Sequence, residues 1–213
     1  MSRWQFLFGL LAVLSCTSNT SIAGSVDFAE KLVRATYYEG LPPEDARDLD
    51  SHGCARLAQM LEDRRELAYH ANIVQALGYS RNQNAFEALR DFASIPLSGE
   101  VDRATFRARL YLPVAMGHLA QFDVRALQWL LANRPDGGQP EWRFRQVRGA
   151  ELKELLSEQF LTGLAHSGAE PARVAIEAAL LEGEVGAVSL RRRKHAQAAR
   201  ELFERGIQEE AAR

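Results

Sequence analysis

Apolar residues recur every three or four positions along most of this chain, which is the spacing of one buried face of an α-helix. The pattern is clearest over residues 71–93, where two such segments flank the polar turn 80–84. This arrangement predicts a helical hairpin. The pattern returns twice downstream. The first copy consists of Ala76-Leu77-Gly78-Tyr79 and Ala88-Leu89, the second of Ala115-Met116-Gly117-His118 and Ala126-Leu127, and the third of Gly163-Leu164-Ala165-His166 and Ala175-Ile176. The sequence therefore predicts an all-α chain of repeated helix pairs.

The spacing of the repeats predicts how the chain is divided. Leu89, Leu127 and Ile176 are equivalent positions, 38 and 49 residues apart, close to the period of helix-pair solenoids. We expect an α-solenoid of antiparallel helix pairs with helical caps. Its predicted parts are cap helices over 24–65, repeats over about 66–94, 101–133 and 150–181, and a C-terminal cap helix over 182–213. Residues 134–147 contain too many prolines and glycines for a helix, and this inserted loop lengthens the second spacing.

The N-terminus is typical of an exported protein. Arg3 precedes the apolar run 6–14, so residues 1–23 are predicted to be a signal peptide. Small residues before Gly24 predict cleavage after Ala23, whereas the stretch ending at Cys16 resembles a bacterial lipobox, in which Cys16 would carry a lipid. No later stretch approaches the roughly 20 apolar residues of a transmembrane helix. We expect a periplasmic or secreted protein, or alternatively a lipoprotein anchored to a membrane through Cys16.

Composition limits the kinds of partner that we expect this chain to bind. The 213 residues carry a net charge of −2 and are 46% hydrophobic, which fits a globular chain with a continuous core. A charge so close to zero provides no positive field for nucleic acid, and we expect no nucleic-acid partner. Cys54 would be the only thiol left after removal of the signal peptide, so we expect no intramolecular disulfide and a buried, inert Cys54.

The repeated hairpins resemble HEAT or HEAT-like repeats over Glu66–Leu181. The resemblance rests on the alanine-leucine-glycine end of the first helix, on an acidic or amide residue in the turn, on the Ala-Leu pair of the second helix, and on a proline inside a first helix. The last of these is Pro113, and the turn residues are Asn84, Asp123 and Glu170. The resemblance implies a stack of helix pairs. Members of the family range from scaffolds to lyases and hydroxylases, so the resemblance implies little about activity.

Tyr79, His118 and His166 occupy the same position at the end of each first helix. In a regular stack they would form a ladder with rings about 10 Å apart, the distance between packed helices. That is too wide for one metal ion, whose imidazole ligands lie about 2 Å from it. The simplest interpretation is that each ring packs on its own turn and bonds a local carbonyl. Iron-binding enzymes of the HEAT-like group use His-Glu pairs, and this sequence has no His-Glu dipeptide, so we expect no metal or other cofactor.

Aromatic and basic residues mark a candidate partner groove. Trp129 lies on a second helix, on the side away from Leu127, where an exposed tryptophan would anchor a partner. Alternatively, Trp129 packs under the inserted loop beside Trp142 or Phe144. The predicted groove residues are Trp129, Arg125, Arg90, Trp142, Arg143 and Arg145. Arg143, Arg145 and Arg148, together with Arg191–Lys194, form either a basic patch for phosphates, anionic lipid or an acidic peptide, or simply a solvated face.

The leading functional hypothesis is a non-catalytic protein-protein interaction or scaffold module of the cell envelope or extracellular space. The sequence has no Gly-rich phosphate loop, no zinc-spaced Cys/His set and no Gly-x-Ser-x-Gly motif, and we expect it not to be an enzyme. The expected partner is a protein or peptide, bound in the groove of the solenoid. The alternative hypothesis is a HEAT-like enzyme or small-ligand carrier, of the lyase or hydroxylase kind, that uses His118 and His166.

Overall fold

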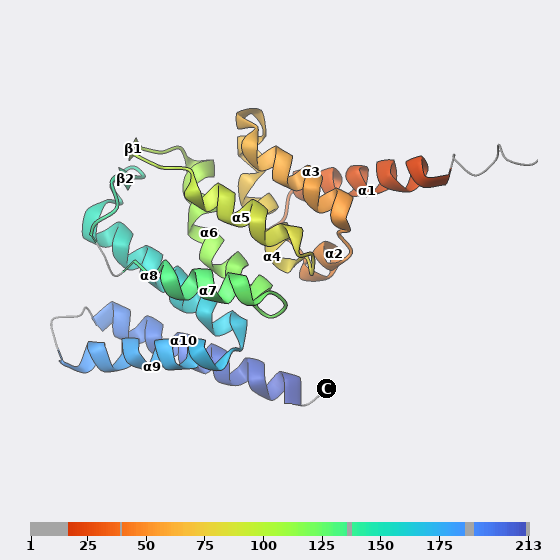
Figure 1. Ribbon diagram of the computed structural model, residues 1–213. Coiled ribbons are helices and arrows are strands. Elements are labelled where there is room, and N and C mark those ends of the chain that lie inside the picture. The colour runs from red at the N-terminus through yellow and green to blue at the C-terminus, as the bar shows by residue number, and fades with distance from the viewer. Residues whose placement is uncertain (1–16, 39, 136–137, 186–189, 212–213) are drawn as a thin grey trace, which may run out of the picture.

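The computed structural model describes residues 17–38, 40–135, 138–185 and 190–211. These residues form ten α-helices, one 3-10 helix and two very short strands (Figure 1). The all-α prediction is therefore confirmed. The helices are α1 (Thr17–Arg34), α2 (Pro43–Arg47), α3 (Ser51–Glu62), η1 (Arg64–Tyr69), α4 (His70–Tyr79), α5 (Asn84–Ser94), α6 (Arg103–Ala120), α7 (Val124–Ala132), α8 (Gly149–Ser167), α9 (Glu170–Val185) and α10 (Leu190–Ala211). The strands are β1 (Gly99–Glu100) and β2 (Trp142–Arg143).

Short polar residues set several helix starts. The Asp50 carboxylate accepts from the backbone N–H of Gly53 at the start of α3, and Asp102 accepts from Ala104 and Thr105 at the start of α6. These bonds satisfy amide groups that have no partner within the helix. Gly168 ends α8 with φ of 63°, a left-handed conformation that favours glycine.

Three consecutive helix pairs lie in the part of the chain where repeats were predicted. Helices α4 and α5 lie within 66–94, α6 and α7 within 101–133, and most of α8 and of α9 within 150–181. The first helices of the pairs, α4, α6 and α8, pack successively against one another, and each also contacts the second helix of its own pair. Their shared core contains fully buried side chains from all three pairs: Ile73, Leu77, Leu89, Met116, Leu119, Leu130, Leu164 and Ile176.

Glycines allow the first helices to come into very close contact. A Cβ added at Gly117 would lie 2.0 Å from the carbonyl oxygen of Gly163, and one added at Gly163 would lie 2.2 Å from the carbonyl oxygen of Pro113. At Gly78 the added atom would lie 2.6 Å from the Cα of Ala115. Real Cβ atoms do not approach backbone atoms so closely, so any larger residue at these positions would push the helices apart.

A pair of parallel strands fixes part of the predicted inserted loop. Gly99 pairs with Trp142 and Glu100 with Arg143, which joins the segment before α6 to the segment before α8 (Figure 1). Phe106 of α6 packs against both aromatic residues of the loop, since its ring centroid lies 6.2 Å from that of Trp142 and 4.3 Å from that of Phe144. Residues 142–144 of the predicted loop are therefore held against the body of the fold.

The N-terminal helix begins earlier than its sequence pattern indicates. The cap helices were predicted to start at residue 24, but α1 already includes residue 17 and ends at Arg34. The Ser25 hydroxyl donates to the Asp50 side chain. Cys16 lies outside the described residues, so the structure does not bear on its lipidation. None of the described helices is long and apolar enough to cross a bilayer. Cys54 is buried, and burial raises the pKa of its thiol.

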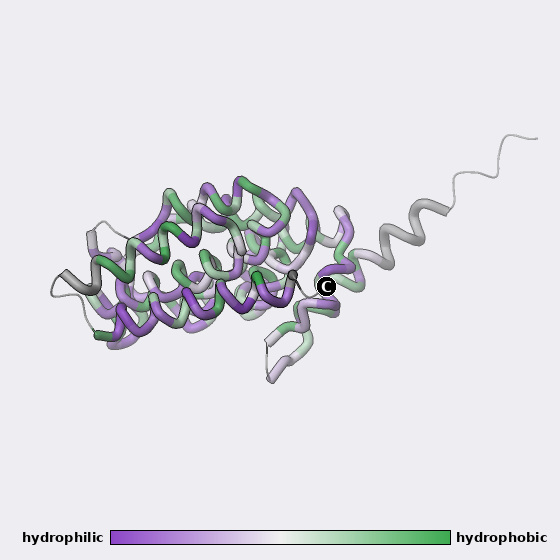
Figure 2. The backbone as a smooth tube through the Cα atoms, turned by 90° about the horizontal axis from the view of Figure 1, so that it is seen from below, coloured by the Kyte–Doolittle hydropathy of each residue, from purple (hydrophilic) through white to green (hydrophobic). Residues whose placement is uncertain are grey.

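The C-terminal helix α10 packs on α8 and α9 through Ala196, Ala199 and Phe203, and most of its other residues are hydrophilic (Figure 2). Its basic start is tied to α8 by the buried Glu158 carboxylate. The Oε1 of Glu158 lies 2.7 Å from the Nε of Arg191 and 2.9 Å from the Nε2 of His195. Of the basic residues Arg191–Lys194, Arg191 therefore forms an ion pair within the fold.

Glu158→Lys should release α10 from the body of the fold. The new ammonium group would be buried opposite Arg191 and His195, and loss of such a contact costs about 3 kcal/mol. Hydrogen exchange followed by mass spectrometry should show α10 amides losing protection, while those of α4 and α6 keep theirs. Glu209→Lys, on the exposed surface of α10, is the control. Equal protection of α10 in both variants would contradict this role of Glu158.

Candidate functional site

A cleft of about 320 Å³ opens on the surface where α5, α6, α7, α8 and β2 meet. Its walls combine apolar, aromatic and polar side chains from segments that are far apart in the sequence. The lining residues are Ala93, Ser94, Ile95, Pro96, Leu97, Arg109, Leu112, Pro113, Trp129, Asn133, Trp142, Leu156 and Phe160. The volume lies at the lower end of the range of ligand sites in proteins. A second hollow of similar volume is lined by α10 residues alone, without an aromatic side chain.

Trp129 and Trp142 both line the cleft. Trp129 is partly buried and stacks on Phe160 of α8, with 5.7 Å between ring centroids and 17° between ring planes. The backbone N–H and side-chain amide of Asn133 both donate to the Trp129 carbonyl at the end of α7. Trp142 reaches the cleft because β2 is paired with β1. Trp129 and Trp142 therefore line the same cleft, and the role of Trp129 as a partner anchor stays a prediction.

Arg109 is the charged residue of the cleft, and the sequence analysis missed it. Its side chain is only 9% exposed. One terminal nitrogen donates to the Ala93 carbonyl at 2.8 Å and the other to the Ile95 carbonyl at 2.6 Å, while Nε has no hydrogen-bond partner. The guanidinium carbon lies 4.6 Å from the ring centroid of Phe92, a cation–π contact. Burial lowers the Arg109 pKa to about 10, so the group stays cationic at neutral pH.

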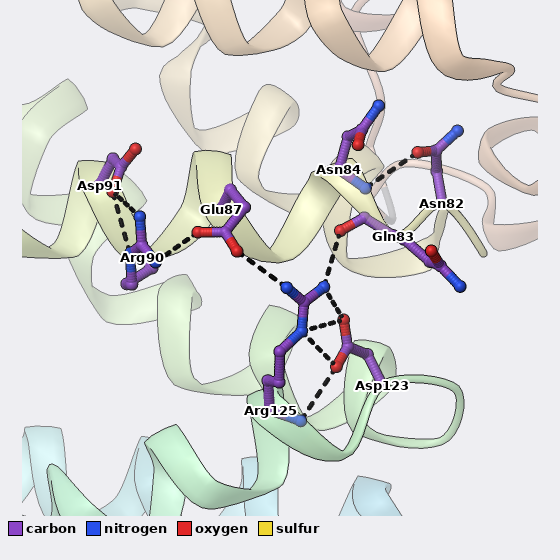
Figure 3. A network of polar contacts seen from close by, with 8 residues as sticks. All are labelled: Asn82, Gln83, Asn84, Glu87, Arg90, Asp91, Asp123 and Arg125. Carbon is purple, nitrogen blue, oxygen red and sulfur yellow. Dashed lines mark hydrogen bonds and ion pairs between the residues drawn. The ribbon is translucent and has the colours of Figure 1, made fainter.

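Arg90 and Arg125, two of the predicted groove residues, belong to an ion-pair network instead of the cleft (Figure 3). Arg125 bridges α7 to α5, because its guanidinium pairs with both Asp123 at 2.7 Å and Glu87 at 2.8 Å. It also donates to the Gln83 carbonyl. Arg90 pairs with Glu87 and with Asp91. Arg125 therefore joins neighbouring helix pairs, whereas the ion pairs of Arg90 lie within α5.

The remaining predicted groove residues are Arg143, which lies in β2, and Arg145, which follows it. Arg143 is exposed and its guanidinium lies 3.4 Å from the Glu100 carboxylate of β1. Arg145 has φ of 54°, a left-handed conformation that is rare outside glycine, and its guanidinium lies 5.1 Å from the Phe144 ring centroid. Of the six predicted groove residues, the structure thus brings only Trp129 and Trp142 into the cleft itself.

Tyr79, His118 and His166 form a continuous row of touching rings, which we call the ring row. The ring centroids of Tyr79 and His118 are 4.7 Å apart, and those of His118 and His166 are 4.1 Å apart. The predicted spacing of about 10 Å is wrong, because the close glycine contacts bring α4, α6 and α8 together just beside these rings. The Tyr79 hydroxyl also lies 2.8 Å from that of Tyr111.

The pKa of each imidazole in the ring row is lowered, which favours the neutral form. Burial, together with His166 and Arg47 nearby, lowers the pKa of His118 to about 3, and burial lowers that of His166. Neither imidazole has a hydrogen-bond partner among the described residues, so the expected bonds to local carbonyls are absent there. Within the described ranges no three or more His, Cys, Asp or Glu side chains are grouped as metal ligands.

Comparisons of the chain with family models, with curated proteins and with solved structures return no match. Function must therefore be argued from the geometry of the chain itself.

Proposed function

We propose that this chain is a non-catalytic binding module, a HEAT-like solenoid that holds a segment of a partner polypeptide in the cleft of Trp129 and Trp142. The observation that carries the proposal is that two tryptophans from distant segments line one open cleft, next to the apolar wall Ile95–Leu97. Ile95 is 46% exposed, so this wall presents apolar surface to solvent. Rigid aromatic rings beside exposed apolar surface are typical of the anchor points of protein interfaces.

The two tryptophans of the cleft are also held in place by neighbouring residues. Trp129 rests on Phe160, and Trp142 is held by Phe106 and by the β1–β2 pair. Side chains held in this way lose little conformational freedom when a partner binds, which favours affinity. Tyr79, His118 and His166 of the ring row do not line this cleft.

Affinity capture followed by a binding measurement tests the proposal. Tagged full chain would capture proteins from a cell-envelope extract, and each captured protein would be purified and titrated against the wild type by calorimetry. Trp129→Ala should weaken binding about 30-fold, because a buried aromatic anchor contributes about 2 kcal/mol or more. Phe122→Ala, which removes a 52% exposed ring outside the cleft, should leave the affinity unchanged.

A partner that binds Trp129→Ala as tightly as the wild type would overturn the assignment of the cleft. Circular dichroism of both variants checks that each remains folded, because Trp129 also contributes to packing against Phe160.

We also propose that the protein is exported and works in the cell envelope or outside the cell. Cleavage after Ala23 would keep the part of α1 that packs into the core through Ala29, Leu32 and Val33. Mass spectrometry of the N-terminus of the native protein distinguishes three results: cleavage before Gly24, a lipid on Cys16, and an intact Met1, which would overturn export by this signal.

A further inference from the structure

The cleft contains a buried cation without an acidic partner. Arg109 is more than nine-tenths buried, and no carboxylate of the described residues pairs with it. Its two terminal nitrogens are engaged by the carbonyls of Ala93 and Ile95, and its Nε–H remains unsatisfied. Elsewhere in the described chain, arginines such as Arg125 and Arg191 lie against carboxylates.

An unpaired buried charge is costly, and the contacts present offset only part of that cost. The carbonyl groups and the Phe92 ring supply partial negative charge, but the site keeps a net positive charge. An anion that enters the cleft would supply the missing charge. Charge complementarity therefore favours an anionic group on the ligand.

The surroundings of Arg109 define what is attached to that anion. Trp129, Trp142 and Phe160 line the same cleft, so the neighbouring part of the ligand must be apolar. The cleft is an open depression of about 320 Å³, which a chain can cross while only side chains enter. In an extended peptide, the side chains of residues i and i+2 point the same way.

We propose that the cleft recognises two side chains of an extended partner segment. One is acidic, and the other, two residues before or after it, is aromatic or branched apolar. The carboxylate pairs with Arg109, and the apolar side chain packs against Trp129 and Trp142. The inference rests on the proposed function, because it names the chemistry of the polypeptide that the same cleft binds.

A peptide library tests this directly. The first library consists of octapeptides capped at both ends. Each carries Asp or Glu at one fixed position, an apolar residue two positions away in either direction, and random residues elsewhere. A second library lacks acidic residues. Binding to the full chain would be measured by fluorescence anisotropy. For peptides that bind, changing the carboxylate to its amide, Asp→Asn or Glu→Gln, should weaken binding to the wild type about 10- to 100-fold. This comparison needs no protein variant, so it holds even if substitution of Arg109 disturbs folding.

Protein variants then assign the effect to Arg109. Arg109→Gln should bind the acid and amide peptides equally weakly, whereas Arg107→Gln, on the exposed side of α6, should behave as the wild type. Equal binding of acid and amide by the wild type, together with loss of binding in Trp129→Ala, would overturn the carboxylate inference but leave the proposed function standing. If no peptide of either library binds, both proposals fail.

Discussion

Gly117→Ala is expected to lower the free energy of unfolding by about 3 kcal/mol or more. The added Cβ would lie 2.0 Å from the carbonyl oxygen of Gly163, and that contact is backbone, so no side-chain rotation relieves it. Helices α6 and α8 would have to move apart, which would also open the core around Met116 and Leu164. The gain in helix propensity from glycine to alanine is only about 1 kcal/mol and does not compensate.

Gly206→Ala is the matched control. Gly206 lies within helix α10, and no atom lies within 4 Å of a Cβ placed there. The same substitution should therefore stabilise the chain by up to about 1 kcal/mol. Urea denaturation of the full chain measures both variants. If Gly117→Ala were as stable as the wild type, α6 and α8 would have to cross at a greater distance than the structure gives.

The second large effect is a loss of stability in mild acid. His118 has a folded-state pKa of about 3, whereas an unfolded histidine has a pKa of about 6.5. Below pH 6.5 the unfolded chain therefore binds a proton that the folded chain does not, and stability falls as the pH falls toward 3. From pH 7.5 to pH 5, His118 alone should cost about 2 kcal/mol. The lowered pKa values of His166 and His70 act in the same direction.

His118→Phe isolates this contribution. Phenylalanine keeps an aromatic ring between Tyr79 and His166 but cannot take up a proton. The variant should lose about 2 kcal/mol less than the wild type over the same pH interval, as measured by urea denaturation at pH 7.5 and pH 5. His52→Gln, at an exposed position, should follow the wild type. Identical pH dependence in His118→Phe and the wild type would show that His118 is accessible to protons in the folded state.

The helical character of the chain could be predicted from sequence because periodic apolar positions directly specify buried helix faces. The hairpin turns were also visible, since Asn84, Asp123 and Glu170 mark the starts of second helices. Strands β1 and β2 were not, because two residues are too few to show a period. Their pairing depends on Phe106 and on a tertiary contact between segments about 40 residues apart.

The site was only partly predictable for a similar reason. Trp129 and Trp142 were recognised by type, and their proximity was one of the expected alternatives. Arg109 lies three and four residues before the buried Leu112 and Pro113, so a charge on an apolar helix face was the signal that could have revealed it. The distance between the rings depends on how closely α4, α6 and α8 cross. Glycines on these helices allow the close crossing, but the sequence pattern indicated only that they stand near helix ends.

The pairing of β1 with β2 has a consequence for synthesis on the ribosome. The walls of the cleft come from residues 93 to 160, and Trp142 is positioned only after the whole α6–α7 hairpin has been made. Domains generally fold from the N-terminus as they emerge. The nascent chain therefore contains the α4–α5 hairpin before the walls of the cleft are complete, and the cleft is complete only when α8 docks. On the proposed function, an incomplete chain lacks the surface that would bind the partner.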